Sequence, residues 1–375
     1  MTCAKSLLAV AVAAAIPAVA SAQVVVSGII KGGVSTTTYS GGTGTGYGSA
    51  LGVNDGSSRL IISGTEKLNQ GMSAFFQIDT RFRVDDNGGG ASGTAPTSGV
   101  PSQLATGNTF VGLSGGFGAL QIGKMDTHYC SGADQHGVRA TALTASSCAL
   151  LGFVNGNSGA AAIANASRST NVIRYTSPTM SGFTLALNHS TSWAGSGSEF
   201  IGTAGKGNAN HGQLVYSAGP ITAGLSNWDA KSEDKTTGQK GLTAWGAYDV
   251  GPVNIGLTWD ESSTTDAGGI KTQRTVTSVP VRFMMGAGTF LATWSRADDT
   301  EVAGAKAANT GASLFSIGYV HDLSKRTSIG ISYGQLNNDP NGKYGLYTQA
   351  SLSGLGAPNT GSDQKQTYIG VRHVF

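Results

Sequence analysis

Residues 171–191 read NVIRYTSPTMSGFTLALNHST and contain the pattern that decides the fold. Apolar and polar residues alternate on both sides of the short polar turn at 178–181, most regularly from Phe183 to Leu187. Because successive side chains of a β-strand point to opposite faces of the sheet, such runs have one apolar face and one polar face. We therefore predict two antiparallel strands with the odd positions of 183–187 on the apolar, lipid-facing side and the even positions facing a lumen.

The same alternation recurs along the chain in segments of about ten residues, separated by clusters of Gly, Asn, Asp, Pro and Ser. Amphipathic helical spacing is largely absent. The predicted strands are 24–34, 58–65, 72–83, 108–114, 119–124, 171–177, 183–191, 211–217, 221–231, 241–249, 253–260, 273–284, 289–297, 312–322, 326–336 and 365–375. Their even number suits a closed antiparallel barrel.

The connections between these strands alternate in length. Short turns such as 115–118, 218–220 and 250–252 alternate with long polar stretches. The long connections are 39–57, 84–107, 125–170, 192–210, 261–272, 298–311 and 337–364. Outer-membrane barrels have short periplasmic turns and long extracellular loops. We therefore predict an all-β, single-domain transmembrane barrel over residues 23–375.

Aromatic residues near the predicted strand ends fit the girdles that such barrels place at the two membrane interfaces. An ordinary β-core would also contain aromatic residues. The aromatic residues assigned to girdles are Phe82, Tyr175, Trp228, Tyr248, Trp259, Trp294, Tyr319 and Tyr333.

The N-terminus has the features of a secretory signal peptide. Lys5 precedes the apolar run 7–15, and Ala20-Ser21-Ala22 forms a small-residue cleavage site. We predict that residues 1–22 are removed, because the apolar run is much shorter than the roughly 20 residues of a spanning helix. The 57 Gly, the 12% of charged residues and a mean hydropathy of −0.04 fit alternating strands. The net charge of +3 offers no concentrated basic face for nucleic acid.

Two cysteines, Cys130 and Cys148, remain after the predicted signal peptide, and both lie in the connection 125–170. In an exported chain we expect one disulfide between them, which would stiffen this long connection. Two free thiols or a partial metal site are the alternatives, although no spacing resembles a zinc motif. No cofactor or nucleotide is implied elsewhere in the chain.

Three stretches resemble the trimeric general porins of the outer membrane, most closely their β-proteobacterial branch. They are FVGLSGGFGALQIG at 110–123, YVHDLSKRTS at 319–328 and YIGVRHVF at 368–375. The resemblance covers essentially the whole mature chain and implies a homotrimer that lets ions and small hydrophilic solutes cross passively. It also implies contact with outer-membrane lipid and lipopolysaccharide, and recognition of Phe375 by the barrel-assembly machinery.

In this family the third extracellular loop folds into the lumen and faces a ladder of basic residues. The corresponding loop here is 125–170. The candidate constriction residues are Arg59, Asp79, Arg81, Asp126, Asp134, His136, Arg139, Arg168 and Arg174. Arginines in a narrow lumen attract anions, but each could instead tie the loop to the wall by hydrogen bonds. Relatives commonly carry a further Arg where this chain has Gly107-Asn108, so we expect a thinner ladder.

Three other functions are compatible with parts of the pattern. One is a substrate-selective porin for small organic anions, and another is a non-conducting surface adhesin or anchor. The third is a Ser/His hydrolase of the outer membrane, which is disfavoured because the six His are scattered over separate segments. We therefore predict a channel and not an enzyme.

Overall fold

The computed structural model describes residues 23–42, 48–54, 58–82, 84, 104–128, 132–133, 150–151, 168–192, 206–346 and 359–375. The predicted signal peptide, 1–22, lies outside these residues and stays a prediction. Apart from the short turn η1 (Asn69–Gly71), the named elements are strands. No helix in the described ranges is long and apolar enough to cross a membrane.

The strands have the following bounds. They are β1 (Gln23–Gly41), β2 (Ser49–Asn54), β3 (Ser58–Lys67), β4 (Ser73–Phe82), β5 (Thr109–Gly115), β6 (Gly118–Asp126), β7 (Arg168–Thr176), β8 (Phe183–Ser192), β9 (Lys206–Ala218), β10 (Ile221–Ser232), β11 (Gly238–Val250), β12 (Val253–Thr265), β13 (Lys271–Met285), β14 (Gly288–Ala297), β15 (Glu301–Val302), β16 (Ala305–Lys306), β17 (Ala312–Asp322), β18 (Thr327–Asn338) and β19 (Ser362–Val374).

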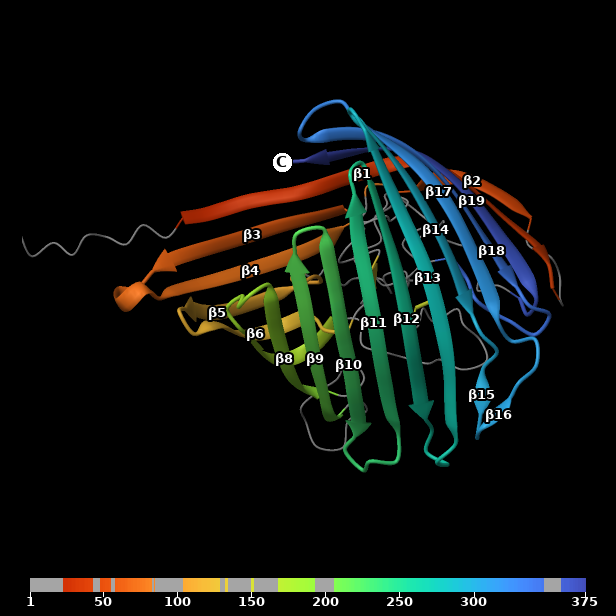
Figure 1. Ribbon diagram of the computed structural model, residues 1–375, viewed down its shortest axis with the longest axis horizontal. Coiled ribbons are helices and arrows are strands. Elements are labelled where there is room, and N and C mark those ends of the chain that lie inside the picture. The colour runs from red at the N-terminus through yellow and green to blue at the C-terminus, as the bar shows by residue number, and fades with distance from the viewer. Residues whose placement is uncertain are drawn as a thin grey trace, which may run out of the picture.

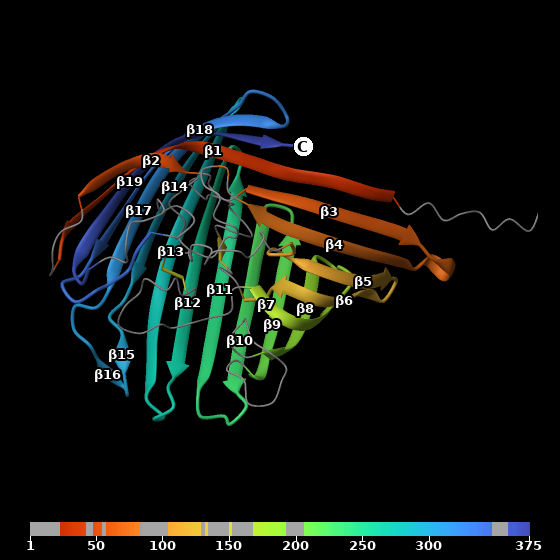
Figure 2. The same cartoon turned by 180° about the vertical axis from the view of Figure 1, so that it is seen from behind.

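These strands form one antiparallel sheet that closes on itself (Figure 1, Figure 2). Neighbours in the chain pair in sequence, and β1 pairs with β19 to complete the ring. Leaving aside the short strands β2, β15 and β16, the ring has 16 strands, which confirms the predicted barrel. Closure removes the unpaired edge that an open sheet would present to lipid.

The first extracellular connection is shorter than predicted. β1 continues to Gly41, and β2 occupies part of the predicted loop 39–57. β2 pairs with Gly33–Thr38 of β1, whereas β3 pairs with Gln23–Ile29. The two strands therefore follow one another along the same edge of β1. The Ser/Thr-rich run after Val34 resembles a loop by its polarity, but its threonines are β-branched and favour a strand.

The alternation read from the sequence sets the two faces of the wall. Phe183, Leu185 and Leu187 of β8 are 45%, 36% and 48% exposed, whereas Asn188 and Ser190 are buried. The odd positions therefore form the outer, apolar face, as predicted. One girdle assignment was wrong: Trp228 is 2% exposed and packs inward with Ala209 and Ala230, because its position on β10 has inward parity.

The barrel closes where β1 pairs with β19, and this seam has a glycine, Gly28, beneath the aromatic ring of Phe375. Gly28 and Phe375 exchange backbone hydrogen bonds, 3.0 Å from Gly28 N to Phe375 O and 3.2 Å in return. A Cβ on Gly28 would lie 2.5 Å from the Arg59 carbonyl oxygen and 2.6 Å from a carbon of the Phe375 ring. The aromatic ring of Phe375 can therefore cover the seam only while residue 28 has no side chain.

We expect Gly28→Val to destabilise the barrel by about 1–3 kcal/mol, because the added side chain overpacks the β1–β19 seam. The measurement is the temperature at which the folded barrel unfolds in detergent. Gly246→Val on β11 is the matched control, since a Cβ there meets nothing within 4 Å. Equal unfolding temperatures for the two variants would refute a special role for the Gly28–Phe375 contact.

Candidate functional site

The first residues after β6 contact the inner face of β10, β11 and β12. The His128 side chain is fully buried, with Nδ1 2.7 Å from Ser226 Oγ on β10 and Nε2 3.4 Å from Thr243 Oγ1 on β11. The backbone N–H of Ala133 donates to Thr258 Oγ1 on β12 at 2.7 Å. These residues of the connection 125–170 therefore lie inside the barrel, as predicted for the third loop.

A second part of the same connection is fixed further round the wall. Leu150 and Leu151 are buried in an apolar cluster with inward residues of β13, β14, β17 and β18. Arg274 of β13 donates from Nη2 to the Leu151 carbonyl oxygen at 3.2 Å, and its guanidinium lies 5.1 Å from the centroid of the Tyr344 ring. Arg274 thus holds the loop by a hydrogen bond and a cation–π contact.

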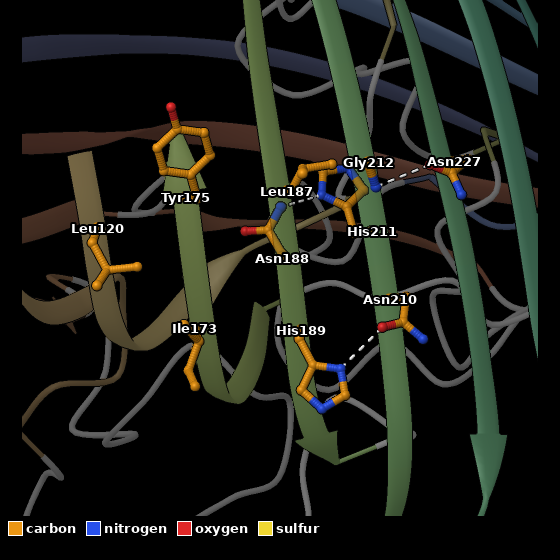
Figure 3. Close-up of a pocket in the computed structure, with 10 residues that line it drawn as sticks. All are labelled: Leu120, Ile173, Tyr175, Leu187, Asn188, His189, Asn210, His211, Gly212 and Asn227. Atoms are coloured by element: carbon orange, nitrogen blue, oxygen red, sulfur yellow. Dashed lines mark hydrogen bonds between the residues drawn. The ribbon is translucent and has the colours of Figure 1, made fainter. Parts of the chain in front are cut away.

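A chain of hydrogen bonds runs from the loop entrance along the inner wall, and each group in this chain donates to the next. Arg174 Nε donates to Asn188 Oδ1 at 2.5 Å, and Asn188 Nδ2 donates to His211 Nδ1 at 2.6 Å. Figure 3 shows the bond between Asn188 and His211. His211 Nε2 then lies 3.0 Å from Ser226 Oγ, which is the atom that also contacts His128.

The chain of hydrogen bonds ends on a carboxylate. From His128 it continues to Thr243, whose hydroxyl donates to Asp260 Oδ2 at 2.6 Å. Arg174 can only donate and ionised Asp260 can only accept. With both imidazoles neutral and protonated on Nε2, every link has one donor and one acceptor. Burial lowers the pKa of His128 from 6.5 to about 4, with Asp260 opposing this shift, which agrees with a neutral ring.

Arg174 also donates from Nη2 to the carbonyl oxygen of Asp126, at the start of the loop. The Asp126 carboxylate in turn accepts from Asn108 Nδ2 at 2.9 Å, while Asn108 Oδ1 accepts from the Asp126 N–H at 2.9 Å. Two of the candidate constriction residues, Asp126 and Arg174, therefore tie the loop entrance to the wall, which is the alternative role considered for the arginines.

Asp79 and Arg81 lie together on the inner face of β4, as their spacing predicts. Arg81 Nε lies 3.1 Å from Asp79 Oδ1, and the two side chains are only 9% and 2% exposed. Residue 107 passes directly over this pair: the Gly107 N–H donates to the Asp79 carbonyl oxygen at 2.7 Å, and a Cβ on Gly107 would lie 2.2 Å from Asp79 Cγ. The Asp79 carboxylate therefore occupies the space that a side chain at 107 would need.

Four cationic residues occupy inner positions on consecutive strands of the ring. Arg59 of β3 pairs with Arg81 of β4, and Lys31 of β1 pairs with Arg372 of β19. Ile29, two residues before Lys31, pairs with Arg59. Val34 on β1 and Val371 on β19 are exposed on the outer face, so Lys31 and Arg372, at positions of the opposite parity, face inward.

We call Lys31, Arg59, Arg81 and Arg372 the basic ladder. Arg59 and Arg81 were among the constriction residues predicted from the sequence, whereas Lys31 and Arg372 were not. Their signal was available, because each alternates with apolar residues of a terminal strand. The backbone of Arg168 begins β7, paired with Asp126. The candidates Asp134, His136 and Arg139 and the pair Cys130 and Cys148 lie outside the described residues.

Comparison with known proteins agrees with this architecture. A family model described as Gram-negative porin matches residues 9–342. Outer membrane porin protein 32 of Delftia acidovorans is 30% identical to the chain over 99% of both sequences. An outer membrane porin of Bordetella pertussis is 26% identical, covering 88% of this chain and 85% of the relative.

Solved structures show the same fold. The anion-selective porin from Comamonas acidovorans superposes with a TM-score of 0.72 at 23% identity, covering 94% of this chain and 100% of that protein. An outer membrane protein of Vibrio cholerae, solved in a trimer form, superposes with a TM-score of 0.63 at 13% identity, covering 94% and 99%. With a closed barrel, a loop docked inside it and a full-length relative, the chain belongs to the Gram-negative porin family.

Proposed function

We propose that this outer-membrane porin is an anion-preferring channel for passive diffusion of ions and small hydrophilic solutes. The observation that carries the proposal is the basic ladder, which places four cations on adjoining strands of the inner wall. In a narrow aqueous lumen such a row raises the local anion concentration and lowers that of cations. The solved Comamonas relative is described as anion-selective, which supports the same preference here.

Three acidic groups of the inner wall have local partners. Asp79 is paired with Arg81, Asp126 accepts from Asn108, and Asp260 accepts from the hydroxyls of Thr243 and Ser262. We therefore assign anion attraction to the basic ladder as a whole, in which Arg81 is paired with Asp79.

We also propose that the protein has no catalytic activity. Ser226 contacts both His128 and His211, which supplies the residue types of a hydrolase. Ser226 of the wall and His128 of the loop are fully buried, however, and His211 is nearly so. A nucleophile must reach its substrate, so the cluster is better explained as the attachment of the loop.

Several further features complete the proposal. We infer a homotrimer, supported by the Vibrio protein that was solved as a trimer. The predicted signal peptide, the Cys130–Cys148 disulfide and constriction roles for Asp134, Arg139 and Arg168 are retained as proposals. Phe375 is proposed as the signal for the barrel-assembly machinery, supported by its place at the seam. We also propose contact with outer-membrane lipid and lipopolysaccharide, which the exposed apolar face supports.

The test is a planar-bilayer recording of the refolded protein under a salt gradient. We expect stable conductance steps grouped in threes and a reversal potential that favours anions. Conductance that saturates on adding a small organic anion would indicate a substrate-selective porin. Correctly folded protein without conductance would contradict the channel and favour the anchor.

A further inference from the structure

Apolar side chains lie on the inner wall beside the basic ladder, although the inner face of a water-filled barrel is ordinarily polar. They share the inward parity of the ladder residues, are half-buried, and are Ile29, Ile61, Phe75, Phe110 and Val374. We call these five residues the apolar band. Their strands β19, β1, β3, β4 and β5 follow one another around the wall (Figure 1), so the apolar band and the basic ladder run side by side.

The apolar band lies on the periplasmic side of the basic ladder. On three strands an apolar residue is two positions from a cation, and the pairs are Ile29 with Lys31 on β1, Ile61 with Arg59 on β3, and Val374 with Arg372 on β19. β1 runs away from the periplasmic end, whereas β3 and β19 run towards it. The apolar residue is therefore the more periplasmic member of each pair, about 7 Å along the strand from the cation.

The two aromatic members of the apolar band lie against the backbone of the wall. The rings of Phe75 and Phe110 meet edge to face, with centroids 6.1 Å apart and planes at 77°. A Cβ on Gly112 would lie 2.7 Å from a carbon of the Phe75 ring. The Phe75 ring therefore covers Gly112, and its remaining surface is directed into the barrel.

Inward apolar residues elsewhere on the wall are explained by the docked loop. Leu150 and Leu151 of the loop are buried together with Leu314 and Leu336 of the wall, and a second buried cluster includes Ala133 of the loop. Within the part of the chain that the structure describes, no member of the apolar band belongs to a buried cluster. The apolar band therefore presents apolar surface inside the barrel that a passing solute can contact.

We propose that the channel favours organic monocarboxylates that have a compact apolar body, of which benzoate is a simple example. The carboxylate lies at the basic ladder while the apolar body lies against the apolar band. The separation of about 7 Å between the two rows is comparable with the length of such an ion. Contact removes apolar area of both the ion and the band from water, which lowers the free energy of the ion in the lumen.

This inference rests on the proposed anion preference and adds a second criterion to it. The basic ladder attracts any anion through its charge. The apolar band distinguishes an anion with an apolar body from a polar anion of the same charge and size, because only the first gains from the loss of apolar area to water. Transport remains passive diffusion.

The test compares benzoate with nicotinate, which has the same charge and nearly the same size but has a polar nitrogen in its ring. The refolded protein is placed in a planar bilayer at neutral pH, with potassium chloride on one side and the potassium salt of either ion on the other. The reversal potential then gives the permeability of each ion relative to chloride. We expect benzoate to be at least about threefold more permeant than nicotinate. Equal permeabilities would overturn the inference.

The double variant Ile29→Thr and Ile61→Thr makes part of the apolar band polar and keeps the β-branched shape that suits a strand. We expect the ratio of benzoate to nicotinate permeability to fall towards one. A change in pore width acts on both ions alike and cancels in this ratio. Ile62→Thr is the matched control, because Ile62 has the outward parity of β3 and pairs with exposed Val26. It should keep the ratio of the unaltered protein, and an unchanged ratio in the double variant would contradict the role of the apolar band.

Failure of this inference can be told apart from failure of the proposed function. A channel that prefers chloride to potassium but passes benzoate and nicotinate equally keeps the proposed function and loses only the apolar criterion. A folded protein without any preference for chloride over potassium loses both, because the apolar band acts on ions that the basic ladder attracts.

Discussion

Neutralising Arg372 or Lys31 is expected to lower the anion-over-cation permeability ratio of the channel several-fold. Both residues face the lumen on paired positions of β19 and β1. A unit charge about 6 Å from an ion changes its energy by roughly 0.7 kcal/mol in water, which is about threefold in local concentration, with opposite signs for anions and cations. Arg372→Gln and Lys31→Gln combined should give the larger change. The measurement is the reversal potential under a salt gradient.

The matched control for this prediction is Lys365→Gln. Lys365 is on the same strand as Arg372 but exposed on its outer face, so its loss removes an equal charge from outside the lumen. The effect of Arg372→Gln should also shrink in concentrated salt, because the Debye length falls to about 3 Å at 1 M. Equal shifts for Arg372→Gln and Lys365→Gln would show that net charge, and not the ladder, sets selectivity.

Acidification from pH 7 to pH 4 is expected to release the loop at His128. Burial holds the pKa of His128 near 4, against 6.5 for an exposed histidine. The stabilisation of the docked loop by neutral His128 is therefore fully present above pH 6.5 and declines as the pH falls towards 4. Below pH 4 the docked loop has lost at most about 3 kcal/mol of free energy. Protonation of Nδ1 also removes the acceptor for the Ser226 hydroxyl. Single-channel recordings should show transitions to altered conductance states up to about a hundredfold more often.

The variant His128→Gln separates the effect of the His128 contact from that of other titrating groups. A glutamine amide can donate and accept hydrogen bonds near Ser226 and Thr243 but does not titrate, so the variant should lose most of the dependence between pH 6.5 and 4. His321→Gln, at the periplasmic end of β17 and distant in the chain, should retain it. His211→Gln tests the second ring that contacts Ser226. Unaltered pH dependence in His128→Gln would assign the transitions to other groups.

The parts of the fold that depend on local pattern were predicted from the sequence. Each strand of the ring overlaps a segment predicted from the sequence, because a two-residue period of polarity records which side chains meet lipid and which meet the lumen. The same period placed Asp79 and Arg81 together. Where the local signal was ambiguous the prediction failed: the first predicted strand stopped at Val34, although β1 continues through the Thr-rich run to Gly41, and Trp228 was assigned to the outer face.

The roles of the charged residues were decided only by the tertiary structure. Arg174 and Arg59 were both predicted as constriction residues on the wall, yet Arg174 ties down the loop entrance while Arg59 belongs to the basic ladder. His128 meets Ser226 98 positions away, and Arg274 meets Leu151 123 positions away. Strand alternation gives the direction of a side chain but not its partner across a lumen. The sequence by itself therefore determined the barrel and its two faces, whereas closure of the ring decided which inward groups hold the loop and which form the basic ladder, because closure brings together residues that are far apart in the chain.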